Sequence, residues 1–131
     1  MYDALRIVAS YDYGFDIAGE HRGLGEPITI EPQTYIGGYR VDFLVGTSFG
    51  DRRIRIVVEC DGHEWHERTK WQASRDKRRD RTLQRHGYLV FRFTGSDIFN
   101  DCQACAHDVL GAIIDWLSEQ ADQAYQRGAI G

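Results

Sequence analysis

The sequence lacks the features of secreted, membrane-spanning and repetitive chains. Its three cysteines are an odd number that cannot all pair within the chain, so we expect reduced thiols and a cytoplasmic location. No apolar run approaches the roughly 20 residues that cross a bilayer. We read no signal peptide, because the N-terminus has no basic region followed by a long apolar segment. In 131 residues we expect a single domain over residues 1–117 and a frayed tail over residues 118–131.

Several functional motifs are also absent. The sequence contains no internal repeat, no glycine-rich nucleotide loop that opens a helix after a strand, and no serine-nucleophile motif. Cys102 and Cys105 have the spacing of a CxxC motif, but both fall on the apolar stripe of a predicted helix. We therefore interpret them as small core residues and not as a redox or metal site.

Charge is distributed unevenly along the chain. The net charge is -4, which taken alone argues weakly against a nucleic-acid partner. Residues 68–85, however, hold eight basic and two acidic side chains, a local balance of +6 that leaves -10 for the rest. A basic segment on an acidic body is compatible with phosphate binding. The alternative is an ordinary solvated helix face.

Local patterns predict a mixed sheet flanked by helices. Two strands on either side of Gly50 and Asp51 form an expected antiparallel hairpin. Thr69 and Gln72 have capping-box spacing, and Gly87 suits a helix end. The expected order is helix 2–10, loop 14–27, strands 28–30, 39–45 and 54–60, helix 69–86, strand 88–93, and a helix from residue 95. The last helix carries an apolar stripe of Ile98, Cys102, Cys105, Val109, Ile113 and Trp116.

Helical periodicity divides the predicted helix 69–86 into two sides. One side contains Leu83 and should face the body of the protein, so its charged residues would form an inward ion-pair cluster. These residues are Asp76, Arg79 and Asp80. The opposite side should face solvent or a ligand. It holds Lys70, Lys77, Arg78, Arg81 and Arg85.

The segment VVECDGHEWHE gathers candidate catalytic groups at the end of a strand. Strand alternation places Glu59 and Asp61 on one face, and Asp42 of the neighbouring strand joins them if the hairpin register allows. Alternation likewise places Val41, Phe43 and Val45 together on one side of that neighbouring strand.

Converging carboxylates repel each other unless a cation lies between them. Oxygen ligands favour Mg²⁺ or Mn²⁺, which can hold a phosphate oxygen and activate a water. His63 and His66 follow the strand and could transfer the proton.

Two other interpretations of this segment remain open. In the first interpretation, the acids are surface residues at the end of a strand and the histidines lie in a capping loop. In the second, Cys60, His63 and His66 bind zinc. Alternation places Cys60 on the face of Ile54 and Val58, however, where a thiol would be buried.

Three stretches together resemble a known nuclease family. They are GGYRVDFLV, IRIVVECDGHEWHE and RDKRRDRTLQRHGYLVFRF, within about residues 31–99. They look like the very-short-patch-repair endonuclease-like branch of the PD-(D/E)xK superfamily. The resemblance implies a restriction-endonuclease-like fold, a divalent metal and DNA as substrate. The resemblance assigns metal binding to Asp42, Glu59, Asp61 and the main-chain carbonyl of Cys60. It assigns proton transfer to His66. The Asp and Arg of the family's following helix correspond to Asp76 and Arg79.

The chain departs from that family pattern at two positions. Asp61 replaces the lysine of the E-x-K motif, so His66 would act in its place. The first helix carries Asp3 where the repair-endonuclease branch has a glutamate, and the candidate substitutes are Glu20 and Glu31. The expected function is a Mg²⁺-dependent DNA endonuclease. The alternatives are a non-catalytic DNA-binding or interaction module on the same fold, and an RNA nuclease.

The histidine assignment is directly testable. His66→Ala should slow cleavage of plasmid DNA by about 10²- to 10⁴-fold, the usual contribution of a general acid or base. His63→Ala should have a smaller effect, because the resemblance places the catalytic histidine at position 66. Initial cleavage rates of the two variants provide the measurement. Equal losses, or a larger loss at position 63, would reverse the two roles.

Overall fold

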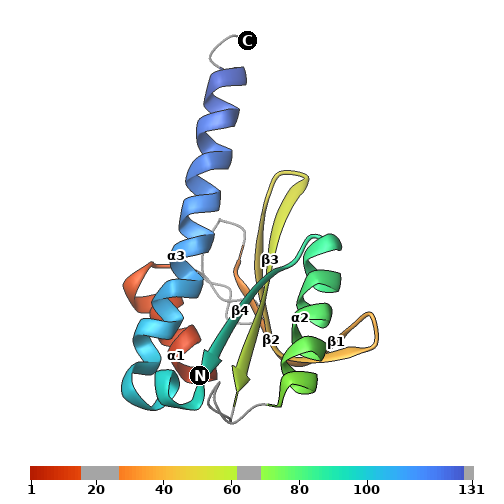
Figure 1. Ribbon diagram of the computed structural model, residues 1–131. Helices are drawn as coiled ribbons and strands as arrows, with labels where there is room; N and C mark the ends of the chain where they lie inside the picture. Colours follow the sequence, from red (N-terminus) through yellow and green to blue (C-terminus); the bar gives the residue numbers. More distant parts are fainter. Residues whose placement is uncertain (16–26, 62–68, 129–131) are drawn as a thin grey trace.

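A mixed sheet of four strands, in the order β1-β2-β3-β4, organises the computed structural model of the chain (Figure 1). The structure describes residues 1–15, 27–61 and 69–128. The strands are β1 (Thr29–Ile36), β2 (Tyr39–Phe49), β3 (Arg52–Asp61) and β4 (Leu89–Thr94). The helical elements are α1 (Tyr2–Ile7), the π-helical turn η1 (Val8–Asp12), α2 (Lys70–Arg85) and α3 (Gly95–Gly128). The expected α/β class, with helices flanking a mixed sheet, is confirmed.

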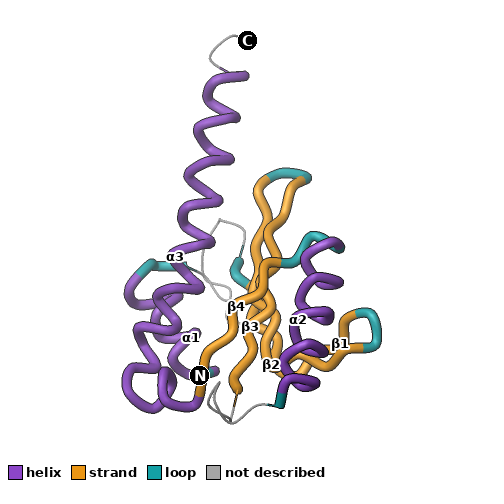
Figure 2. The backbone as a smooth tube through the Cα atoms, viewed as in Figure 1, coloured by secondary structure: helices purple, strands orange, loops and turns teal. Residues whose placement is uncertain are grey.

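Helices cover both faces of the sheet. α1 and α3 lie against one face and α2 against the other (Figures 1 and 2). The larger core lies under α1 and α3 and includes Ile56 and Leu110. A smaller core under α2 contains Val41, Val57 and Leu83. Both faces of β3 are therefore buried, which explains its nearly continuous run of β-branched residues.

Strand connections bring the candidate residues to one end of the sheet, where β3 and β4 finish; we call this end of the strands the sheet edge. β1, β2 and β3 pair antiparallel, as expected for the hairpin, whereas β3 and β4 pair parallel with α2 as the crossover. Asp61 and Thr94, the last residues of the two parallel strands, are register partners. The two arrowheads thus end at the same sheet edge, the lower edge in Figure 1, where α2 begins.

Both predicted ends of α2 are confirmed. The Thr69 hydroxyl accepts a hydrogen bond from the Gln72 amide (3.1 Å), and the Gln72 side chain accepts one from the Thr69 amide (3.0 Å). This capping box satisfies amide groups that have no partner within the helix. After the helix, Gly87 adopts the left-handed φ of 89° that allows the chain to turn back into β4.

The prediction that Val41 lies on the same side of β2 as Phe43 and Val45 was wrong. Phe43 and Val45 face the larger core, but Val41 packs with Val57 and Leu83 under α2. Gln33 of β1 lies between the partners of Phe43 and Val41, and its φ of 51° is in the left-handed region. An extended strand alternates strictly only while its backbone stays extended. The alternation of β2 reverses at the position where the β1–β2 pairing is interrupted.

α3 is a long helix with one interruption. Asp101 has an extended backbone (φ -158°, ψ 83°), and its carboxylate caps the continuing helix by accepting from the Ala104 amide (2.9 Å). The helix then includes the segment that we expected to be a frayed tail, up to Gly128. There Arg52 of β3 donates to the side chains of Gln120 (2.9 Å) and Gln123 (2.7 Å). No helix among the described residues, α3 included, is apolar and long enough to cross a membrane.

Candidate functional site

The centre of the site is a pair of carboxyl groups on adjacent strands. Glu59 of β3 is only 6% exposed and faces α2, as alternation predicted. Asp42 of β2 lies beside it, and the two carboxyl groups are in hydrogen-bonding contact. The amide of Cys60 donates to Asp42 Oδ2 at 2.7 Å. This bond extends the contact between β2 and β3 beyond their last main-chain pair, Phe43 with Val58, and holds Asp42 against Glu59.

Glu59 has an unusual protonation equilibrium because of this environment. Burial raises the pKa of Glu59 from 4.5 to about 7; the positive charge of Arg79 opposes the rise, and the nearby Asp42 adds to it. A carboxyl group of this kind exchanges its proton near neutral pH. It can also release that proton when a cation arrives.

Arg79 connects α2 to the acidic pair. Its Nη2 forms an ion pair with Glu59 Oε1 and also donates to the carbonyl of Arg40 at 2.6 Å. The guanidinium lies over the ring of Tyr39, 5.6 Å from the ring centroid. One side chain of the helix therefore contacts both strands that carry the candidate acids.

Arg92 of β4 forms a second bridge that the sequence did not reveal. It binds Asp61 (3.2 Å) and Asp80 of α2 (2.7 Å), so that Asp61 is an ion-pair partner in this structure. Its only sequence signal was its position as the single charged residue in an otherwise apolar strand. A charge in such a strand is expected to have a buried partner.

The predicted inward side of α2 does face the sheet. Its charged residues, however, bind partners on the strands: Arg79 pairs with Glu59, and Asp80 with Arg92. Asp76 is half-buried on the same side. All five residues of the predicted outer side are exposed: Lys70, Lys77, Arg78, Arg81 and Arg85. The helix therefore separates structural ion pairs from an exposed basic surface.

Not every predicted site residue can be placed. His63 and His66 lie outside the described residues. Among the residues that are described, no group of three or more acidic, histidine or cysteine side chains is arranged to hold a metal ion. Asp42 and Glu59 are together, whereas Asp61 is oriented toward Arg92.

Cys60 is better suited to a structural role than to zinc binding. Burial, and to a smaller degree the charge of Asp42, raises the pKa of the Cys60 thiol to about 11. A metal-binding cysteine is normally a thiolate. Near neutral pH this thiol holds its proton, and the other two proposed zinc ligands, His63 and His66, lie outside the described residues. Cys105 is buried, as expected for a core residue, and Cys102 is half-buried.

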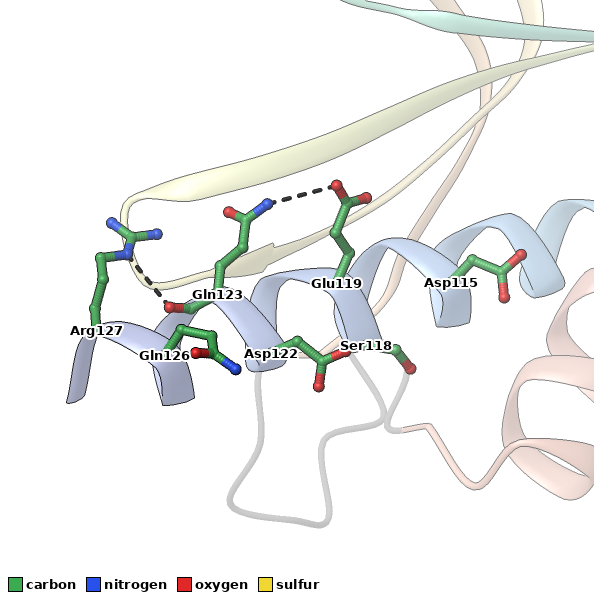
Figure 3. A pocket seen from close by; sticks show the side chains of 7 residues that line it. All are labelled: Asp115, Ser118, Glu119, Asp122, Gln123, Gln126 and Arg127. Carbon is green, nitrogen blue, oxygen red and sulfur yellow. Dashed lines mark hydrogen bonds between the residues drawn. The ribbon is translucent and has the colours of Figure 1, made fainter. Parts of the chain in front are cut away.

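A wide hollow on α3 does not belong to this site. It has a volume of about 730 Å³ and lies along the C-terminal half of the helix (Figure 3). Its lining residues are Asp115, Ser118, Glu119, Asp122, Gln123, Gln126 and Arg127. Three acids and a single cation make it a poor surface for phosphate.

The topology and the acidic pair define a protein of the restriction-endonuclease-like fold. Residues 23–113 match the model of the family REase_MTES_1575, a restriction endonuclease-like family, and the chain belongs to it. No curated protein and no solved structure matches the chain. The family supports a PD-(D/E)xK-type nuclease fold and hence a nuclease, while the very-short-patch-repair branch stays a prediction.

The raised pKa of Glu59 predicts how stability depends on pH without added metal. Between pH 4.5 and about 7 the folded protein retains a proton that the unfolded chain has released. The free energy of unfolding should therefore fall as pH rises through this window, by up to about 3 kcal/mol from this group. Glu59→Gln cannot ionise and should remove that part of the slope. Urea unfolding in EDTA at several pH values measures it.

Glu31→Gln is the matched control, because Glu31 is an exposed glutamate of the same sheet. It should retain the slope of the parent protein. If Glu59→Gln and Glu31→Gln give the same pH dependence, Glu59 does not titrate near neutral pH.

Proposed function

We propose that this protein is a divalent-metal-dependent endonuclease that hydrolyses DNA phosphodiester bonds. The observation that carries the proposal is the contact between Asp42 and Glu59 at the sheet edge, with the pKa of Glu59 raised to about 7. Two neighbouring carboxyl groups, one of them with a raised pKa, are the arrangement expected where a cation can take the place of the proton. Membership of the family supports the nuclease class.

The donor set suits Mg²⁺ or Mn²⁺. Asp42 and Glu59 would hold the ion, with Asp61 and the carbonyl of Cys60 assisting, and all of these ligands are oxygens. When bound, such an ion polarises a phosphate oxygen and lowers the pKa of a water. The Cys60 amide orients Asp42 by donating to its Oδ2. Arg79 balances the charge of Glu59.

Proton transfer is assigned to His66, with His63 in a supporting role, on the family resemblance alone. Asp61 stands where the superfamily pattern has a lysine and is paired with Arg92. Since a guanidinium cannot give up its proton near neutral pH, Arg92 does not replace the missing lysine as a general base. An imidazole beside the acidic edge would supply one.

DNA would lie along the exposed side of α2. The five basic residues of that side are exposed along the whole helix, from Lys70 to Arg85, and Arg79 of the same helix contacts the acidic pair. Positive charge gathered there can hold phosphates even though the protein as a whole is acidic.

A non-catalytic DNA-binding or interaction module on the same fold is the second candidate. The ion pairs Arg79–Glu59 and Arg92–Asp61 favour it, since they neutralise two of the candidate ligands without metal. Mn²⁺ titration separates the candidates: the endonuclease should bind the ion through Asp42, and a purely structural acidic pair should not. Competition between DNA and RNA of the same sequence tests the nature of the substrate.

The catalytic assignment predicts the behaviour of Asp42→Asn. The amide oxygen of asparagine can still accept from the Cys60 amide, whereas alanine would leave that amide without its partner. Fold and melting temperature should thus be retained, while Mg²⁺-dependent cleavage of plasmid DNA falls by at least about 10²-fold. Plasmid nicking rates and thermal melting provide the measurements.

Asp51→Asn makes the same chemical change at an exposed turn of the same hairpin and serves as the control. It should cleave at the parental rate. A folded Asp42→Asn protein that does so as well would rule out the metal assignment.

The basic surface predicts a salt effect. Each lost phosphate contact lowers the slope of log K against log [salt] by about 0.9 on duplex DNA. Arg78→Ala combined with Arg81→Ala should weaken binding to all sequences alike and flatten the slope by up to about 1.8. Fluorescence anisotropy at several salt concentrations in EDTA measures this without cleavage.

Two variants sharpen that comparison. Arg53→Ala combined with Arg127→Ala removes the same charge from exposed positions outside α2 and should leave the slope nearly unchanged. Arg79→Ala should lower the melting temperature before it affects the slope, because Arg79 binds Glu59 and the Arg40 carbonyl. If the α2 double variant keeps the parental slope and affinity, DNA lies elsewhere.

A further inference from the structure

A second site lies at the other end of α2, where a pocket of about 330 Å³ opens between the last turn of the helix and the sheet. Its wall combines apolar, aromatic and cationic groups. They include Ile36, Leu83, Tyr39, Tyr88, Arg55 and Thr82. The volume is at the lower end of the roughly 300–1,000 Å³ of small-molecule sites, so it suits one ring system with its substituent.

Arg55 is held in a fixed position on the wall of this pocket. Its guanidinium lies 4.3 Å from the ring centroid of Tyr88, donates to the Tyr88 hydroxyl (3.2 Å), and donates to the carbonyl of His86 (3.3 Å). None of the ion pairs found in the described parts of the chain involves Arg55. A cation that is oriented by neutral groups and has no carboxylate partner among the described residues is suited to bind an external anion.

The rest of the wall suits a flat ring. Tyr39 and Tyr88 are half-buried, and Ile36 and Leu83 supply apolar surface beside them. Aromatic side chains bind nucleobases by stacking, with little dependence on which base is present. We propose that this pocket binds one nucleoside monophosphate unit, with its phosphate on Arg55 and its base against the tyrosine and aliphatic surface.

The pocket is linked to the acidic pair through one shared neighbour. Arg79 contacts the ring of Tyr39 and forms the ion pair with Glu59. Along β3, Arg55 and Glu59 lie on the same side and are four residues apart, a separation of about 13 Å. If the proposed endonuclease function holds, the pocket would receive an unpaired nucleotide a few positions from the cleaved bond, so DNA with an extruded nucleotide would be a preferred substrate.

Binding experiments in EDTA test the pocket separately from cleavage. The first arm titrates the protein with deoxyadenosine monophosphate, deoxyadenosine and inorganic phosphate by calorimetry. The second compares a fluorescent duplex that contains one unpaired adenosine with the fully paired duplex. Arg55→Gln removes the cation, and Thr82→Phe fills the pocket from α2. Arg53→Gln is the control, since it makes the same change at an exposed position on β3.

We expect one of two results. Either the protein binds the free nucleotide more tightly than it binds phosphate or the nucleoside, or it binds the duplex with the unpaired adenosine more tightly than the fully paired duplex. The first outcome identifies a free nucleotide as the ligand and the second a nucleotide within a strand. Either should be weakened at least about tenfold by both pocket variants and changed less than about twofold by Arg53→Gln.

The absence of both kinds of binding, or binding that Thr82→Phe retains, would overturn the proposal. Thr82→Phe decides the question even if Arg55→Gln does not fold, because Thr82 is only half-buried on the helix surface. A failure of the nuclease proposal is visible separately, as no plasmid cleavage with Mg²⁺ or Mn²⁺.

Discussion

The contact of the buried Glu59 with Asp42 on one side and Arg79 on the other is the interaction on which the rest of the structure depends. An ionised carboxylate in this position is unfavourable unless a charge or a proton compensates it. Arg79 supplies a charge from α2, and Asp42 makes the proton harder to lose. The same contacts fix the position of α2 on the sheet, since Arg79 also binds the Arg40 carbonyl. Stability, helix placement and protonation at the sheet edge are thus properties of one cluster.

α2 separates two kinds of charge because its sides have different neighbours. Arg79 and Asp80 face the sheet and have partners there, whereas Arg78 and Arg81, next to them in sequence, are exposed. Successive helix residues point about 100° apart, so adjacent arginines can have unrelated roles. The acidic edge lies at the beginning of this helix and the nucleotide-sized pocket at its end.

Local signals were sufficient to predict most of the fold. The capping box at Thr69 and the left-handed position of Gly87 depend on nearby residues, and alternation placed Glu59 correctly. Long-range pairing was not predictable in this way. The reversal at Val41 coincides with the backbone of Gln33 on another strand. Arg92 reaches Asp61 and Asp80 only because β3 and β4 pair parallel in one register and α2 crosses above them. The helical C-terminal segment likewise bonds to Arg52 across the chain.

The pairing of Asp61 with Arg92 gives a physical account of the departure from the E-x-K pattern. A lysine at position 61 would bring one positive charge and an ionisable amine to the sheet edge. Here an aspartate occupies that position, and the guanidinium comes from the adjacent strand at 3.2 Å. The pair is close to neutral, which limits its repulsion of Asp42 and Glu59. Arginine keeps its proton at all physiological pH values. Arg92 therefore replaces the positive charge of the missing lysine but cannot replace its ability to accept and release a proton. The imidazoles that follow β3 in sequence are the nearest groups along the chain that titrate near neutral pH in their unperturbed state.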